Sequence, residues 1–450
     1  MDMFLTPEQF MGHFPKPPTI TREQFVNTLV VSYRGNPRLI DLFEFRCPRV
    51  IKTPDDYRIT NREAIVNYLY DIAVVNRDKY LLEFYERYYT FPNPFSLVWT
   101  DTCKIYTAST VNPTVYDQIE KVRGLYNSDD SDGAFKLMLN EINKVIELPI
   151  GVLSTQKNDQ ARYMIRNLHY LDILHTTKIT NSVKCDVSFW QTFINLFNKM
   201  ILEDRFFCKS VLELCLKKGD SNTFFYHIQQ YQPKASILNP YTINWILKNV
   251  FTGTKLFTPV LSWSSYLMAF MHSDWEEYVG VDVIESVCDK TRYMFDYYQK
   301  LPQMPKNNKT IDIICCPSED LYHNEPFLNK YRNHFDAIIM CPPYYDMEIY
   351  ESGKQSIKTF KTYKEWLQGY WEYTVAVNQV VLKKGGKFGF IVNDYESLKK
   401  VMYPLIDDLN MIALKYFKLV DVFRLINRGS PLRVNYKLRT EMLFVYEKID

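Results

Sequence analysis

The second half of the chain predicts a layered α/β fold. Two observations predict it: after about Ala235 the sequence changes to short apolar runs typical of buried strands, and helical patterns lie between most of these runs. This alternation is the order that an α/β sheet requires. The first half shows helical spacing instead. Because 450 residues are too many for one compact core, we expect a mostly helical domain over residues 1–234 and an α/β domain over residues 235–450.

Six apolar runs are the expected strands of the sheet. In a sheet of this kind, ligands bind beyond the carboxyl ends of the strands, so the residues directly after each run are the candidate site. In chain order the runs are Lys255–Leu261, Glu277–Val283, Ile311–Cys316, Phe335–Cys341, Gly386–Val392 and Glu441–Glu447.

The first half predicts helices that are separated by turns. Apolar residues recur at three-and-four spacing over Asn61–Tyr89 and Val187–Lys218, and Asn-Pro breaks occur within Phe91–Phe95 and Val111–Val115. The polar run Asn127–Gly133 has no apolar period, which predicts a surface loop or a hinge. None of these segments indicates a particular chemistry.

Composition predicts a globular protein of a reducing, intracellular compartment. Hydrophobic residues make up 46% and charged residues 24%, which is enough to bury a normal core. No stretch approaches twenty apolar residues, and the first ten residues lack the blocks of a secretory signal, so no membrane association is expected. The nine cysteines include no C-x-x-C pair, and the seven histidines are scattered singly. We therefore expect no metal site and assign the histidines no role.

The run Phe335–Tyr350 indicates a chemistry, because a strand leads directly into Cys341-Pro342-Pro343-Tyr344. Two successive prolines fix the backbone and remove two amide donors, which suits a rigid platform at the end of a strand. An aromatic ring held on that platform can stack on an extruded base. Groups that accept the hydrogens of a base amino group make its nitrogen a better nucleophile.

This segment resembles the S-adenosylmethionine-dependent DNA amino-methyltransferases, whose tetrapeptide is commonly Asp, Asn or Ser followed by Pro-Pro-Tyr. The resemblance extends over most of the second half, in the order of the family, through Ala235–Phe251, Gly353–Leu367 and Leu382–Val392. The versions that these segments resemble most are those of bacteriophages and large DNA viruses. The resemblance implies a Rossmann-like fold, S-adenosylmethionine as cofactor, DNA as substrate, and a phage or viral protein that acts inside the host cell.

The resemblance also implies which residues form the site. Cys341, Pro342, Pro343 and Tyr344 are the candidate catalytic residues. Asp282, at the tip of the second strand, is expected to accept the ribose hydroxyls of the cofactor, although a helix N-cap is the alternative role for an aspartate there. The candidate cofactor-binding residues are Asn239, Pro240, Thr258, Pro259, Ser262, Trp263, Ser264, Asp282, Ser318 and Glu319.

The sequence departs from the family at two places. Thr258 stands where the first motif usually has aspartate, and Ser262 and Ser264 stand where it has glycines, so a left-handed backbone there would cost about 1 kcal/mol or more per residue. Cys341 replaces the oxygen acceptor, and a thiol accepts hydrogen bonds weakly. The carbonyl of Pro342 remains as an acceptor. A nucleophilic Cys341 is an alternative role, but the surrounding motifs do not resemble those of enzymes that methylate cytosine carbon.

The distribution of charge predicts phosphate contacts that the net charge of +2 does not. Between Lys415 and Arg439 lie seven basic residues with Asp421 as the only acid, and the segment after the tetrapeptide adds four lysines among Phe360, Tyr363 and Trp366, of which Trp366 is expected to be buried. A solvated basic face is the alternative. The candidate nucleic-acid-binding residues are Lys354, Lys358, Arg424, Arg428 and Arg433.

The leading hypothesis is a DNA adenine N6-methyltransferase whose N-terminal helical domain helps to grip DNA, with cytosine N4 as a second target. A rival of another class is a methyltransferase fold that has lost catalysis and serves as a nucleic-acid-binding or transcription subunit, which the first-motif and Cys341 departures favour. An RNA methyltransferase differs only in substrate, because a flipped adenine looks alike in both nucleic acids. Protein partners, oligomeric state and target sequence are not predicted.

Overall fold

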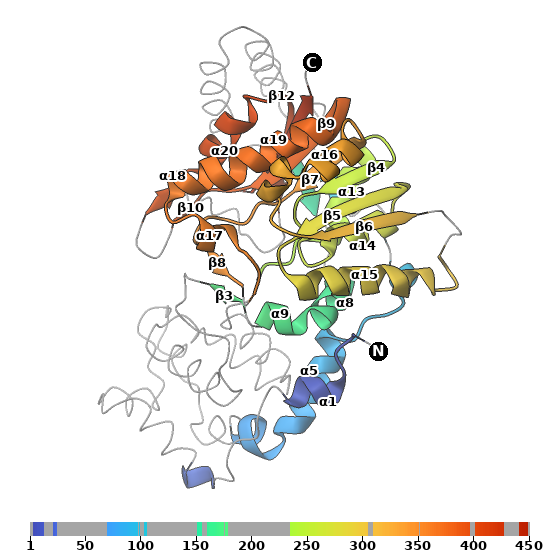
Figure 1. Ribbon diagram of the computed structural model, residues 1–450. Helices are drawn as coiled ribbons and strands as arrows, with labels where there is room; N and C mark the ends of the chain where they lie inside the picture. Colours follow the sequence, from blue (N-terminus) through green and yellow to red (C-terminus); the bar gives the residue numbers. More distant parts are fainter. Residues whose placement is uncertain are drawn as a thin grey trace. The chain divides into compact units, whose positions relative to one another are not determined.

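The computed structural model divides into two compact units, one of which contains the whole of the second half (Figure 1). Unit 1 comprises Met1–Thr90, Leu174–Thr177 and Val183–Lys234, and unit 2 comprises Phe91–Ile173, Lys178–Ser182 and Ala235–Asp450. The structure describes residues 3–12, 21–24, 70–97, 99, 103–105, 151–154, 160–174, 176–178, 235–304, 309–350, 352–396, 401–426 and 441–448. The expected helix over 187–218, the break at 111–115 and the polar run at 127–133 lie outside these residues.

Unit 1 is helical where it is described. Its elements are α1 (Pro7–Gly12), the π-helix η2 (Asp71–Val75) and α5 (Arg77–Tyr88). Helix α1 begins at a reciprocal cap, in which the Gln9 N–H donates to Thr6 Oγ1 (3.2 Å) and the Thr6 N–H donates to Gln9 Oε1 (2.9 Å). The ring of Phe10 packs against the ring of Tyr89, the C-cap residue of α5, with centroids 5.0 Å apart. The helical spacing predicted over 61–89 is confirmed for residues 71–88.

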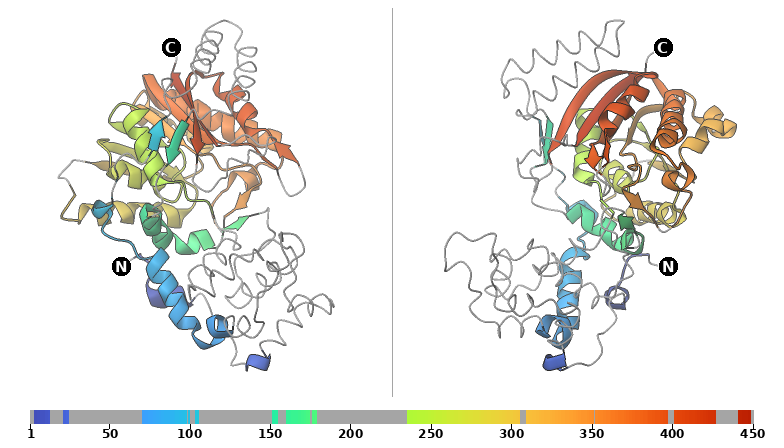
Figure 2. Two further views of the ribbon diagram at one scale, coloured as in Figure 1. Left: turned by 180° about the vertical axis from the view of Figure 1, so that it is seen from behind. Right: turned by 90° about the vertical axis from the view of Figure 1, so that its left-hand side faces the viewer.

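Unit 2 is built on a nine-stranded mixed sheet in the order β1-β2-β12-β13-β9-β7-β4-β5-β6 (Figures 1 and 2). Strands β4, β5, β6, β7 and β9 run parallel, and β13 is antiparallel to both of its neighbours, β9 and β12. The strands are β1 (Cys103–Ile105), β2 (Gly151–Ser154), β4 (Lys255–Thr258), β5 (Glu277–Asp282), β6 (Thr310–Cys315), β7 (Phe335–Met340), β9 (Leu382–Val392), β12 (Phe417–Ile426) and β13 (Met442–Lys448).

The seven strands of the second half have a Rossmann-like order. Numbered from β4, they follow 6-7-5-4-1-2-3, in which the first five strands make the doubly wound arrangement with a switch point between β4 and β7. The order explains how four chain segments reach one edge of the sheet, because the carboxyl ends of parallel strands lie together. The Rossmann-like α/β fold predicted for this half is confirmed by this strand order.

Two groups of helices cover opposite faces of the sheet (Figure 2). One group contains α13 (Pro240–Asn249), α14 (Ser265–Met271) and α15 (Glu285–Gln299), and the other contains α16 (Glu325–Tyr331), α19 (Glu372–Val381) and α20 (Leu405–Ala413). Shorter elements are η3 (Pro94–Ser96), α8 (Gln160–Leu168), α9 (Tyr170–Leu174), β3 (Thr177–Lys178), η5 (Glu319–His323), β8 (Glu348–Ile349), α17 (Ser356–Thr359), α18 (Tyr363–Trp366), η6 (Leu367–Trp371), β10 (Tyr395–Glu396) and β11 (Met402–Tyr403). No helix among the described residues is long and apolar enough to cross a bilayer.

All six predicted strands are present, and a seventh was missed. Strand β12 lies in the first part of the basic segment Lys415–Arg439. There Lys418, Asp421 and Arg424 interrupt the apolar residues, so the strand pattern is not visible in the sequence. Strand β4 is shorter than its apolar run, since Pro259 cannot donate a ladder hydrogen bond. Unit 2 also takes in Phe91–Ile173, whose short strands β1 and β2 extend the sheet beyond β12. The division of roles between residues 1–234 and 235–450 stays a prediction.

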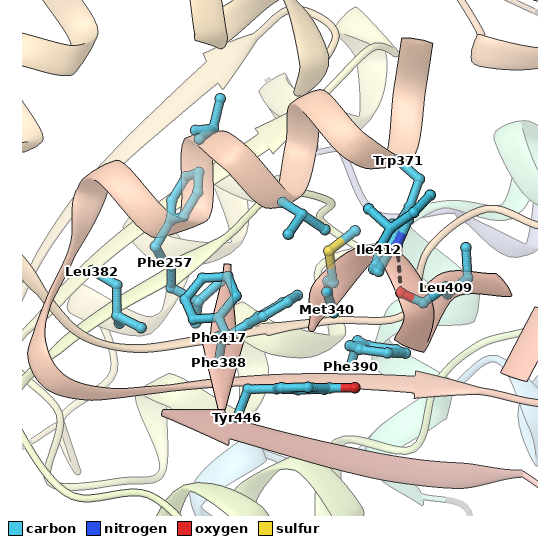
Figure 3. Close-up of a cluster of buried hydrophobic side chains, with 14 of the residues drawn as sticks. Phe257, Met340, Trp371, Leu382, Phe388, Phe390, Leu409, Ile412, Phe417 and Tyr446 are labelled. Carbon is cyan, nitrogen blue, oxygen red and sulfur yellow. Dashed lines mark hydrogen bonds between the residues drawn. The ribbon is translucent and has the colours of Figure 1, made fainter. Parts of the chain in front are cut away.

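A large hydrophobic core of the described residues lies between the sheet and the helices α19 and α20 (Figure 3). Phe390 of β9 is fully buried, and its ring stacks on Tyr446 of β13 with centroids 5.7 Å apart and meets Trp371 edge-on at 5.1 Å. The Trp371 indole N–H donates to the Leu409 carbonyl at 2.9 Å, so α20 is tied to the same point. Trp366 is fully buried, as predicted.

We predict that Phe390→Ala lowers the free energy of unfolding by about 3–5 kcal/mol, because it removes a buried aromatic ring and leaves a cavity between two tightly packed layers. Chemical denaturation followed by circular dichroism measures the change. The control is Leu171→Ala, which removes an exposed side chain from α9 and should change the value by no more than about 0.5 kcal/mol. Equal effects of the two substitutions would contradict this account of the core.

Candidate active site

The four segments that the sequence singled out meet at the carboxyl edge of the parallel strands. The loop Pro259–Ser264 follows β4, Asp282 ends β5, Ser318 and Glu319 follow β6, and Cys341–Tyr344 follows β7. Strand β4 pairs with β5 on one side and with β7 on the other, so its loop lies between the predicted ribose carboxylate and the tetrapeptide. Sheet topology alone therefore assembles one candidate site at the switch point.

The loop after β4 has an unusual backbone. Ser262, Trp263 and Ser264 have φ values of 46°, 55° and 64°, so three successive residues other than glycine are left-handed. The Ser265 N–H donates to the Ser262 carbonyl at 3.0 Å and closes the turn into α14. Each left-handed residue costs roughly 1–2 kcal/mol that glycine would not cost. The serines thus keep the backbone conformation that the family's glycines favour, and the cost predicted from the sequence is present.

Thr258 does not act in place of the missing aspartate. Its side chain is fully buried, and its hydroxyl lies 2.7 Å from the hydroxyl of Tyr278 on β5. The threonine therefore ties two central strands together. The next turn also depends on Gly280, since a Cβ there would lie 2.4 Å from Leu261 Cδ2 and 2.8 Å from the Tyr278 hydroxyl. Any larger residue at 280 would push the loop away from the sheet.

Asp282 ends β5 and accepts hydrogen bonds from the backbone on both sides of the site. Its Oδ2 accepts from the Leu261 N–H at 3.3 Å and its Oδ1 accepts from the Ile284 N–H at 3.1 Å. Burial raises the pKa of this carboxyl to about 6, against the effect of these hydrogen bonds. The alternative role as helix cap does not apply, because the N-cap of α15 is Ile284 and no side chain caps that helix. A carboxylate has about four lone-pair sites, so Asp282 keeps acceptor capacity beyond these backbone contacts.

Ser318 and Glu319 open the short helix η5 beside this carboxylate. The Ser318 hydroxyl lies 3.0 Å from the hydroxyl of Thr374 on α19. Glu319 is 6% exposed, and burial raises the pKa of its carboxyl to about 7, with the charge of Asp320 adding to the rise. A buried carboxyl at the end of β6 is suited to accept hydrogen bonds from a polar ring such as adenine.

The tetrapeptide forms the rigid platform that its prolines predicted. The Tyr344 hydroxyl donates to Asn393 Oδ1 and accepts from the Asn393 N–H at 2.9 Å, directly after β9. The Tyr344 ring stacks on Tyr395, with centroids 5.6 Å apart and planes 29° apart. Asn393 and Tyr395 are site residues that the sequence analysis missed, because no spacing connects them to a tetrapeptide some fifty residues earlier.

The Cys341 thiol is a neutral group. Burial raises its pKa well above the usual range, and the nearby charges of Glu441 and Glu348 raise it further. A covalent nucleophile needs the thiolate, so this environment argues against the nucleophilic role. Around Cys341 lie several buried hydroxyls. Those of Tyr266 and Tyr370 interact electrostatically with Cys341. The buried hydroxyl of Ser265, the first residue of α14, has no hydrogen-bond partner among the described residues.

Asn239 and Pro240 begin α13 at the same edge. The Asn239 side chain caps the helix by accepting from the Tyr241 N–H at 3.0 Å, and Pro240 occupies the first turn. The Asn244 amide donates to the Ala269 carbonyl, and the Trp275 indole, beyond the end of α14, donates to the Leu247 carbonyl. The contact nearer the start of α13 is made to the earlier residue after β4, and the contact further along α13 is made to the later one. The two helices therefore run parallel and begin at the same end.

The structure describes only some of the candidate nucleic-acid-binding residues. Lys354 and Lys358 are exposed, and Lys354 Nζ forms an ion pair with Asp320 at 2.8 Å. Arg428 and Arg433 and the side chain of Arg424 lie outside the described residues. The aromatic residues that accompany the lysines point into the protein: the Phe360 ring packs on Gly369, and the Tyr363 hydroxyl donates to Asp408 at 2.9 Å. Their packing leaves the lysines without the exposed stacking rings that the sequence suggested.

Two further residues were missed because they come from the first half of the chain. His169, between α8 and α9, is fully buried, and its Nε2 lies 2.8 Å from the hydroxyl of Ser264. Asp172 lies beside it, with Oδ2 3.6 Å from His169 Nδ1. The sequence analysis assigned the histidines no role, and a single histidine on a helical pattern offers no signal by which this one could be found.

No protein-family model and no curated protein matches the chain. Among solved structures, TrmN from Thermus thermophilus is 13% identical over 47% of this chain and 49% of TrmN, with a TM-score of 0.32. The matched part thus spans about half the length of TrmN. A 1,6-didemethyltoxoflavin-N1-methyltransferase from Burkholderia thailandensis is 12% identical over 47% and 78% of the chains (TM-score 0.30), and a predicted O-methyltransferase from Agrobacterium tumefaciens is 13% identical over 44% and 74% (0.29). The fold assignment rests on the strand order.

We predict that iodoacetamide at pH 8 alkylates Cys315 roughly tenfold or more faster than Cys341, because Cys315 is exposed whereas Cys341 is only partly exposed and its thiol is neutral. Quenched samples analysed by peptide mass spectrometry give both rates from one reaction. Rapid alkylation of Cys341 would contradict the account of its environment and would restore the covalent role.

Proposed function

We propose that the protein transfers a methyl group from S-adenosylmethionine to the exocyclic amino group of a nucleic-acid base, with adenine N6 of DNA as the favoured target. The observation that carries the proposal is that a Cys341–Tyr344 platform and the Asp282 carboxylate lie at the same edge of a Rossmann-like sheet, on either side of the loop that follows β4 at the switch point. A binding module would need neither the buried carboxylates of the β5 and β6 ends nor the proline-fixed platform.

The residues at the site fit the cofactor. Asp282 keeps acceptor capacity for ribose hydroxyls, and Glu319 is a buried carboxyl suited to the adenine amino group. The hydroxyl of Ser265, which has no hydrogen-bond partner among the described residues, lies at the start of α14, where a polar group of the methionine end would find a partner. When bound, S-adenosylmethionine supplies a methyl sulfonium, the electrophile of the reaction. The protein's own task is to bind, to exclude water and to orient the amine.

Orientation of the amine falls to the tetrapeptide. Tyr395 backs one face of the Tyr344 ring, which leaves the other face for a flipped base. The Pro342 carbonyl is the strong acceptor for the amino hydrogens, and the neutral Cys341 thiol is a weak second one. We therefore expect a slow enzyme whose platform positions the base well and whose acceptor pair is incomplete.

The rival function remains a catalytically inactive subunit that binds nucleic acid, and it is favoured by Thr258, whose hydroxyl is used within the sheet instead of facing a cofactor. Cytosine N4 and RNA adenine are alternative targets of the active enzyme, because the platform reads the face of a base. Phosphate contacts by Lys354 and Lys358, and a DNA-gripping role for residues 1–234, belong to the same proposal.

We predict micromolar binding of S-adenosylhomocysteine, and a loss of about tenfold or more in affinity for Asp282→Ala, since each charge-assisted hydrogen bond contributes about 1.5–3 kcal/mol. Ribose hydroxyls donate to the ionised carboxylate, whose pKa is about 6. Affinity should therefore be constant above about pH 7 and fall as the pH drops through 6. Calorimetric titration at several pH values measures this, with Asp282→Asn as the control that should bind weakly at every pH. Absence of any binding by the native protein would favour the inactive subunit.

We predict that Cys341→Ser retains or raises methyl transfer, because it supplies the oxygen acceptor, while Tyr344→Ala loses transfer through lost stacking of about 1–3 kcal/mol. Tyr344→Phe is the matched control: it keeps the ring and removes only the bonds to Asn393. Transfer of tritiated methyl groups to double-stranded DNA, single-stranded DNA and RNA measures all three variants. If no version transfers methyl groups and Tyr344→Ala still weakens binding, the platform serves recognition alone.

A further inference from the structure

We infer that His169 and Asp172 are positioning residues for the cofactor loop, and that they replace the conformational freedom of the missing glycines. The inference rests on the proposed function for the identity of the ligand. The structural part of the inference is that contacts from His169 and Asp172, here called the clamp, hold the loop at Ser264. This part does not depend on any ligand. Both residues lie in Phe91–Ile173, the segment of the first half that belongs to the same compact unit as the sheet.

The loop requires something to hold it. Three consecutive left-handed residues other than glycine are strained, and such strain persists only where the surroundings over-determine the conformation. Ser264 is the last of the three and is also the N-cap residue of α14, yet its side chain makes no capping hydrogen bond. The usual partner for a serine at this position is therefore absent, and its hydroxyl is used in another way.

The Ser264 hydroxyl lies within hydrogen-bond distance of two other side chains. It lies 2.8 Å from His169 Nε2 and 2.7 Å from the Thr291 hydroxyl of α15, and all three side chains are fully buried. The Thr291 hydroxyl in turn lies 2.7 Å from the Val287 carbonyl, one helical turn earlier. These contacts fix the side chain of Ser264 and, through its Cα, the left-handed turn.

His169 is itself held in place. Its Nδ1 lies 3.6 Å from Asp172 Oδ2, which is an electrostatic contact beyond hydrogen-bond distance. Asp172 in turn accepts from Lys290 Nζ and the Ser286 hydroxyl, each at 2.5 Å. Burial alone would raise the pKa of Asp172, but His169 and Lys290 outweigh it and hold that pKa well below its usual range. The anionic Asp172 thus connects the imidazole to α15, the helix that follows Asp282. One clamp sets the loop and the ribose carboxylate against the same helix.

Serine, histidine and aspartate in this order also form hydrolytic triads, and the geometry must be weighed against that role. A nucleophilic serine has to be reached by a carbonyl carbon. Here Ser264 has no exposed surface, and its hydroxyl is occupied by Thr291 as well as by His169. Burial therefore makes the group a support and not a nucleophile.

The clamp predicts a specific dependence on residue 264. Glycine adopts the left-handed region without strain and has no hydroxyl that needs partners. Removal of His169 should therefore be harmful when residue 264 is serine and much less so in the Ser264→Gly background. A role of His169 in general packing would instead produce the same loss in both backgrounds.

The experiment is a double-mutant cycle with His169→Ala and Ser264→Gly, read out by S-adenosylhomocysteine affinity and by thermal unfolding without ligand. We expect His169→Ala to weaken affinity about tenfold or more in the native background and less than about threefold in the Ser264→Gly background. The melting temperature should show the same pattern. His169→Gln, which keeps a nitrogen donor or acceptor near the position of Nε2, should retain most of the affinity.

His272→Ala is the matched control, because His272 is another largely buried histidine of the same unit, bonded to Tyr298 at 3.0 Å, outside the loop. Its effect should be equal in both backgrounds. An equal loss from His169→Ala in both backgrounds overturns the inference, as does labelling of Ser264 by a fluorophosphonate. If the native protein binds no S-adenosylhomocysteine, the proposed function fails, and the unfolding cycle still decides the inference.

Discussion

The site depends on one constraint, which is that the central strand leaves the sheet after only four residues. Strand β4 ends at Thr258 because Pro259 cannot donate a ladder hydrogen bond to the parallel strands on either side, and the chain turns there towards α14. That turn sets the left-handed backbone of Ser262–Ser264, the close approach of Leu261 to Gly280, and the amide that Leu261 donates to Asp282. The geometry of the loop thus follows from the position at which β4 ends. The surrounding side chains stabilise the strained backbone that results.

The departures from the family pattern have different physical weights. At the loop, serine retains the backbone that glycine would adopt, and the cost is met by buried hydrogen bonds. At the tetrapeptide, cysteine retains the shape of serine but loses acceptor strength, and the burial that keeps the thiol neutral offers no compensation. The first change alters how the fold is held together. The second alters the chemistry, so it bears more directly on whether methyl transfer occurs.

Most of the sheet and the location of the site followed from sequence, while the supports of the site did not. Apolar runs that are buried on both faces predicted six strands, and the ends of those strands predicted where Asp282 and Cys341 lie. Strand β12 was hidden because its charges break the apolar pattern. His169, Asn393 and Tyr395 act through contacts with residues that are distant in sequence, and no local period encodes such contacts. The aromatic residues near the lysines were misplaced because core packing and base stacking require the same side chains.

The place of β13 in the sheet has a consequence for biosynthesis. This strand follows both of its partners in the chain, yet it lies between them, antiparallel to β9 and to β12. Until the ribosome has released Met442–Lys448, both partners present unpaired edges, and exposed edges of this kind invite association between chains. Strand β2 remains without its β12 partner for longer, because the residues of β12 are synthesised more than 250 residues after it. The nascent polypeptide therefore carries unpaired strand edges until β13 has been made, and a chaperone that shields strand edges would be most useful to it during that interval.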